Sequence, residues 1–270
     1  MGNFESSYEE YEDVPVNKPP LRNWEITENS TRYERLVAAP SDEDRILMWW
    51  MWGIVASVAV MPVLTVFVGI LSSARARKSA FNQYLLFLVT PDITYTSICI
   101  VNCFLNIAEG EFYSEFMCYF QSWYVMFGIS GSAYMNALLA REIYHMLSYG
   151  QNFRHYETPT TAKIARDSIA VLLFSAFVSS WGIYNGVWHV TWLPYKTVLM
   201  NGLGCFPQDF DLPTGLFYYL FAYPALLAAP MGYVFFLCFR IWYKKMLPKQ
   251  GRRRMLATFF LRLVAIYVIM

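Results

Sequence analysis

The sequence predicts an all-α membrane protein with several membrane-spanning helices, and three observations support this. Hydrophobic residues make up 56% of the 270-residue chain and charged residues only 15%, whereas soluble domains carry about 25% charged residues. Five continuous apolar stretches alternate with loops whose charge changes sign each time. Lipid admits only helices and closed barrels, because every backbone polar group must be satisfied within the protein. The stretches show no alternation of period two, so we expect helices.

The five expected spans cover residues 47–71, 84–107, 118–140, 168–190 and 215–243. Each reaches the roughly 20 residues that a helix needs to cross the hydrocarbon core. A sixth apolar run occupies residues 255–270. At about 1.5 Å per residue it reaches only about 24 Å, so we expect an incomplete sixth helix. Residues 46–270 are therefore expected to form a multi-pass bundle that lacks some of its helices.

The loop charges predict the orientation of the bundle. Basic residues without acids follow the first span, at Arg75, Arg77 and Lys78, and more basic residues follow the third and fifth spans. Acidic residues without bases follow the second span. Because Lys and Arg favour the cytoplasmic side, we expect the first, third and fifth loops there and the amino terminus outside.

Residues 1–45 are expected to form a disordered, acidic, extracellular tail. They hold eleven acidic and five basic residues, several prolines and little apolar periodicity, a composition typical of disorder. Asn29 begins an Asn-Ser-Thr glycosylation sequon, which can be used only if the tail is outside. Gly2 lies in a myristoylation pattern, which requires a cytosolic tail. The two alternatives exclude each other, and the loop charges favour glycosylation.

Asp92 is the most informative polar residue, because it lies inside the second expected span next to Pro91. An acid at membrane depth costs several kcal/mol unless it faces the bundle interior or water. We therefore expect a ligand or ion network with Ser132 and Asn136 of the third span, or with Asn102 further along the second. The alternative is an interfacial acid near a helix end.

Small residues are concentrated in the third span, and they predict that this helix is central. They are Gly128, Ser130, Gly131, Ser132 and Ala133. Small side chains allow membrane helices to approach closely. Prolines inside the spans, at residues 62, 91, 224 and 230, predict kinks.

Tryptophans at the start of the first span are expected to be lipid anchors. Trp49, Trp50 and Trp52 lie where the span begins, and tryptophan favours the headgroup level of the bilayer.

Cys118 and Cys205 both fall on the outer side in the predicted orientation. An oxidising compartment there permits a disulfide. The other cysteines, Cys99, Cys103 and Cys238, lie within spans. If a disulfide forms outside, these two residues are the available pair, and the bond would hold the long outer loop over the third helix.

Taken together, these residues resemble the rhodopsin-like superfamily of G-protein-coupled receptors. Residues 82–92, with Asn and Asp around a Leu-rich core, look like the second-helix pattern of that family. Cys118 and Cys205 occupy the positions of the family disulfide, and Arg141 resembles the arginine that touches the G protein. Ala140 stands where the family has an acid, which indicates a divergent branch nearer the cyclic-AMP-receptor-like families.

This resemblance covers residues 45–270 and implies both a fold and a function. The fold is a seven-helix receptor bundle, of which five complete helices and part of a sixth are present. The function is a plasma-membrane receptor that transduces an extracellular ligand signal to a heterotrimeric G protein in the cytoplasm.

Two other functions remain as alternatives. Asp92 and the helix prolines also suit a polytopic transporter. Residues 128–131, Gly-Ile-Ser-Gly, match a short motif of rhomboid intramembrane proteases with Ser130 as the nucleophile, although His189 is the only histidine near a span. Membrane lipids are expected partners, nucleic acid is excluded by the membrane context, and no motif suggests a metal or cofactor.

Overall fold

A computed structural model describes residues 38, 40–111, 114–151, 156–180, 196–208, 216, 218–247 and 258. These residues are mostly helical. In chain order the elements are α2 (Asp42–Ser72), α3 (Ala74–Arg77), α4 (Ala80–Glu109), α5 (Glu115–Gln151), α6 (Thr161–Ser179), β1 (Lys196–Met200), β2 (Gly204–Gln208), the π-helical turns η2 (Tyr218–Ala222) and η3 (Pro224–Ala228), and α9 (Ala229–Tyr243).

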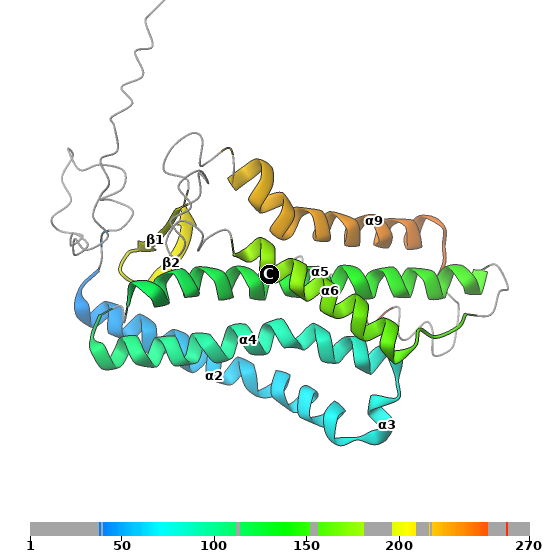
Figure 1. The fold of residues 1–270 in the computed structure, drawn as a ribbon, viewed down its shortest axis with the longest axis horizontal. Coiled ribbons are helices and arrows are strands. Elements are labelled where there is room, and N and C mark those ends of the chain that lie inside the picture. The colour runs from blue at the N-terminus through cyan, green and yellow to red at the C-terminus, as the bar shows by residue number, and fades with distance from the viewer. Residues whose placement is uncertain are drawn as a thin grey trace, which may run out of the picture.

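Helix α5 lies at the centre of an elongated bundle (Figure 1). It contacts α4, α6, α9 and both strands, while α2 packs on α4. The strands lie at the end where α2 and α5 begin, which we call the hairpin end. Helix α3 lies at the opposite end, where α5 and α9 finish and α6 starts, which we call the α3 end. A buried apolar core near the α3 end joins α4, α5, α6 and α9 through Tyr84, Leu147, Ile164 and Ile241.

Among the described residues, three helices are long and apolar enough to cross a membrane, namely α2, α4 and the segment Tyr219–Tyr243. Side chains of α2 such as Val58 and Met61 are 68% and 66% exposed. A soluble protein rarely leaves such an apolar surface in water. Helix α5 has 37 residues but is more polar, and its serines Ser122, Ser130 and Ser132 are buried inside the protein. Most of the expected sixth run, and the second half of the fourth, lie outside the described residues.

Helix boundaries follow from local capping. The Ser41 hydroxyl accepts a hydrogen bond from the Asp44 backbone N–H at 3.2 Å, and acids fill the first turn of α2. Both features stabilise a helix amino terminus. Helix α2 therefore starts at Asp42, inside the segment that we assigned to the tail. Helix α4 ends at Glu109, and the capping residue that follows is Gly110, whose φ of 75° suits glycine.

The expectation of an all-α chain misses an antiparallel hairpin. Strands β1 and β2 pair with Leu199 opposite Cys205. The turn between them has positive φ at Asn201 (53°) and Gly202 (63°). An Asn-Gly pair tolerates this backbone and is a strong hairpin signal in a sequence.

Two glycines of α5 allow close contact with α4. A Cβ atom at Gly128 would lie 2.7 Å from Cβ of Tyr95, and one at Gly131 would lie 2.9 Å from Cγ of Pro91. Ordinary carbon contacts are about 3.5–4.0 Å. The small residues of the third span therefore determine how closely α4 and α5 approach.

The fifth span contains a π-helical segment around its prolines. The Ala229 backbone N–H bonds to the Pro224 carbonyl, five residues earlier. Continuing this pattern would pair residue 230 with the Ala225 carbonyl, but Pro230 has no N–H. The Tyr134 hydroxyl of α5 donates to that carbonyl at 2.5 Å. A side chain of the central helix thus satisfies a backbone group that the proline leaves unpaired.

Candidate functional site along helix α5

At the hairpin end, a disulfide joins Cys118, near the start of α5, to Cys205 in β2. Their Cα atoms are 5.1 Å apart, and 87 positions separate them in the chain. The backbone N–H of Cys205 also donates to Oε1 of Gln121 at 3.0 Å. Both Cys205 and Gln121 are buried. The hairpin is therefore fixed to α5 by a covalent bond and by a buried hydrogen bond.

Helix α2 holds the hairpin from the other side through Trp49. The Trp49 indole N–H donates to the carbonyl of Leu203 in the hairpin turn at 3.0 Å. Its side chain is fully buried, and the Arg45 guanidinium lies 5.9 Å from the centre of its ring. The prediction that Trp49 is a lipid anchor is therefore wrong, whereas Trp50 and Trp52 are exposed. A membrane tryptophan with a carbonyl within reach satisfies its N–H inside the protein.

In the middle of the bundle, Asp92 of α4 meets Ser132 of α5. The Ser132 hydroxyl donates to Oδ1 of Asp92 at 2.6 Å. None of the ion pairs found among the described residues involves Asp92. An acid here needs hydrogen bonds or a cation to offset the loss of water. Ser132 is buried and supplies one such bond.

The structure does not bring the other expected members of this network to Asp92. Asn136 is half-buried one turn beyond Ser132, and no hydrogen bond among the described residues joins it to Asp92. Asn102 donates instead to the Tyr124 hydroxyl at 3.3 Å. Of the expected network, the structure therefore brings only Ser132 into hydrogen-bond contact with Asp92 among the described residues.

At the α3 end, Arg141 lies between two carboxylates. Its Nη2 atom is 3.4 Å from Oε1 of Glu142 and 3.4 Å from Oδ2 of Asp167. Arg166 pairs with the other oxygen of Asp167 at 3.0 Å. Arg141 remains 38% exposed, while Glu142 and Asp167 are largely covered. The cluster ties the end of α5 to the start of α6.

Tyr156, in the segment before α6, extends this cluster. Its hydroxyl donates to the Glu142 carboxylate. Burial, together with the negative charge of Glu142 and this hydrogen bond, raises the pKa of Tyr156 to about 12. The sequence pattern does not predict Glu142 or Tyr156 as members of the cluster around Arg141. The adjacency of Arg141 and Glu142 was the available signal, but nothing local indicated Tyr156.

Ser130, the residue of the protease alternative, lies among other serines. Its hydroxyl is 2.5 Å from that of Ser175 and 3.1 Å from that of Ser179, and all three are buried. A serine nucleophile needs a general base, and neither partner is one. His189, the histidine considered for that role, lies outside the described residues, as does the glycosylation candidate Asn29.

The described residues contain no group of three or more metal-binding side chains. No protein-family model and no curated protein matches the chain.

Proposed function

We propose that this protein is a receptor-like membrane protein, which transduces an extracellular ligand signal to a cytoplasmic G protein. One observation carries the proposal. A single continuous helix, α5, bears the disulfide-anchored hairpin at one end, the Asp92–Ser132 contact in its middle and the Arg141 cluster at the other end. The resemblance of the sequence to G-protein-coupled receptors places the family disulfide at the outer end of this helix, the G-protein contact at its inner end, and Asp92 on the neighbouring second helix.

In this proposal the hairpin end faces outside and the α3 end faces the cytoplasm of a plasma-membrane receptor. The charges support this orientation. The first turn of α2 is acidic at the hairpin end, whereas the α3 end carries Arg75, Arg77, Lys163 and Arg166. Lys and Arg favour the cytoplasmic side of membranes.

A ligand at the hairpin end would act by favouring one arrangement of α5 over another. A ligand shifts such an equilibrium only by its difference in affinity for the two states. The pairs that α5 makes with α4 and α6 are the contacts that would differ between the states. Arg141, which is bonded to Asp167 at 3.4 Å and still 38% exposed, is the side chain that would be released toward a G protein.

The test is nucleotide exchange on purified heterotrimeric G proteins by the full-length protein in lipid nanodiscs. We expect Arg141→Ala to reduce the exchange rate about tenfold or more, since a hydrogen bond to a charged group contributes about 1.5–3 kcal/mol. Arg166→Ala is the matched control, because it also removes an arginine from Asp167. Equal losses in both variants, or no exchange by the wild type on any G-protein class, would contradict the proposal.

The second candidate is a transporter that uses Asp92. The observation in its favour is an acid inside α4 with a hydroxyl partner at 2.6 Å, because intramembrane acids often carry protons or cations. Proton and Na⁺ flux into proteoliposomes tests it. Asp92→Asn should abolish the flux, and Glu109→Gln, at an exposed acid of the same helix, should leave it unchanged. Undiminished flux in Asp92→Asn would rule out this candidate.

A further inference from the structure

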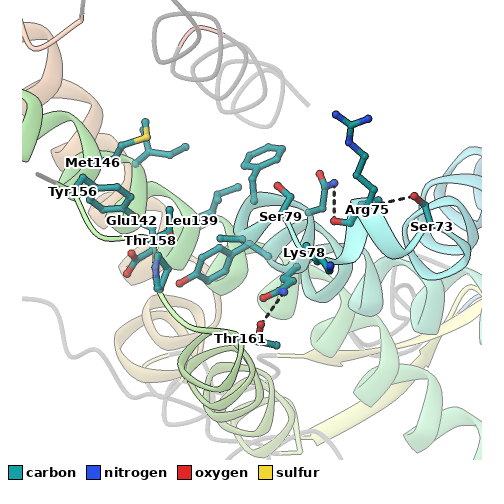
Figure 2. A pocket seen from close by; sticks show the side chains of 18 residues that line it. Ser73, Arg75, Lys78, Ser79, Leu139, Glu142, Met146, Tyr156, Thr158 and Thr161 are labelled. Carbon is teal, nitrogen blue, oxygen red and sulfur yellow. Dashed lines mark hydrogen bonds between the residues drawn. The ribbon is translucent and has the colours of Figure 1, made fainter.

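A cavity of about 1120 Å³ lies at the α3 end (Figure 2). It is bounded by α3, the start of α4, the last turns of α5 and the segment before α6. Figure 2 shows Ser73, Arg75 and Lys78 on one side of it and Glu142, Tyr156 and Met146 on the other. The volume exceeds the roughly 300 Å³ at which small-molecule sites begin.

One wall of this cavity carries two cations. Arg75 and Lys78 line it, and both are exposed. In the part of the chain that the structure describes, neither takes part in an ion pair. The acid on the opposite wall, Glu142, is already bonded to Arg141 and to the Tyr156 hydroxyl. The cavity therefore offers unpaired positive charge on one side and a neutralised acid on the other.

The rest of the lining is largely apolar and lies at the edge of the membrane-crossing region. Phe81, Leu139, Ile143 and Met146 contribute apolar surface. Helix α4, which is apolar enough to cross a membrane, starts at Ala80 within this lining. The cavity thus lies where an apolar helix meets its basic loop, which is the depth of lipid headgroups.

We propose that this cavity binds an anionic glycerophospholipid, with the headgroup phosphate on Arg75 and Lys78 and the acyl chains along the apolar lining. Basic pockets beside membrane helices bind anionic headgroups in this way. The charge of the α3 wall is complementary to phosphate, and the apolar lining is complementary to hydrocarbon. The proposal requires only that the helices lie in a membrane, so it stands apart from the receptor proposal.

The test is native mass spectrometry of the full chain in detergent, titrated with dioctanoyl phosphatidylserine or dioctanoyl phosphatidylcholine. The variant R75Q/K78Q removes both cavity cations at exposed positions and should still fold. The matched control is K163Q/K245Q, which removes two exposed cations at the same end that do not line the cavity. Soluble glycerophosphoserine separates binding of a lipid from binding of a free phosphate.

We expect the wild type and the control to prefer phosphatidylserine to phosphatidylcholine. In R75Q/K78Q the affinity for phosphatidylserine should fall about 30-fold, because each surface cation contributes roughly a fivefold gain in affinity. Absence of the preference in the wild type would overturn the proposal and leave the cavity to another occupant, such as a protein segment. Equal losses of phosphatidylserine affinity in R75Q/K78Q and K163Q/K245Q would show that binding depends on surface charge in general and not on the cavity, and would also overturn the proposal. Equal affinity for the soluble headgroup would show a free-anion site and also overturn it.

Discussion

Replacing Gly128 by alanine tests whether α4 and α5 pack as the structure shows. The new Cβ atom would lie 2.7 Å from Cβ and 3.1 Å from Cγ of Tyr95. A carbon contact needs about 3.5–4.0 Å, so the shortfall is about 1 Å. Both Cβ atoms are attached directly to the backbone, so no side-chain rotation relieves the clash. The two helices must separate, and overpacking of this kind costs about 1–3 kcal/mol.

Gly69→Ala provides the matched control, because a Cβ atom at Gly69 of α2 would meet nothing within 4 Å. Alanine stabilises the interior of a helix by about 0.5–1 kcal/mol relative to glycine. We therefore expect Gly69→Ala to be neutral or stabilising and Gly128→Ala to be destabilising.

The assay is thermal unfolding of both variants in the same detergent, followed by tryptophan fluorescence. A loss of 1 kcal/mol lowers Tm by about 2–4 °C in a chain of this size range. The Gly128→Ala protein should therefore melt at least several degrees below the Gly69→Ala protein. If the two variants melt together, α4 and α5 do not approach as described, and the account of the small residues in α5 is wrong.

Three further predictions concern the ends of α5 and its contact with the fifth span. Cys205→Ser should reduce the free energy of unfolding by about 2–5 kcal/mol, and a reducing agent should lower Tm of the wild type but not of the variant. Tyr134→Phe should cost about 1–3 kcal/mol, because the Ala225 carbonyl loses its donor, and chemical denaturation measures the loss. Burial, together with the nearby Glu142, raises the pKa of Tyr156 to about 12, above the value of about 10 in an unfolded chain. This tyrosine therefore stabilises the fold below pH 10. That contribution should disappear between pH 10 and 12. The free energy of unfolding should therefore fall less over this range in Tyr156→Phe than in the wild type. Identical pH profiles of the two proteins would contradict this prediction.

Much of the candidate site could be recognised from residue types alone. Asp92 is conspicuous because an acid inside an apolar run is costly. Ser132 of the third span is one of the partners that the sequence predicts for it. Cys118 and Cys205 are the cysteines that fall on the outer side in the predicted orientation, and the structure joins them. The sequence does not predict the cluster around Arg141, because Asp167, which pairs with Arg141, and Tyr156, which bonds to Glu142, come from a separate segment whose path the sequence does not specify.

The hairpin was missed for a different reason. Its Asn201-Gly202 turn is a local hairpin signal in the sequence, but the flanking residues by themselves indicate only a connection between two spans. What fixes the hairpin against the helices is long-range, namely the disulfide to α5 and the Trp49 hydrogen bond, which spans 154 positions in the chain.

The sequence by itself determined that the chain forms long helices of a membrane protein, because a helix satisfies its own backbone hydrogen bonds and needs only sufficient apolar length. Only the tertiary structure decided which polar groups meet. The Tyr134 hydroxyl reaches the Ala225 carbonyl across 91 positions, and Trp49 points inward while Trp50 is exposed. Such contacts depend on how each helix is rotated and placed against its neighbours, and apolar composition alone does not specify that rotation.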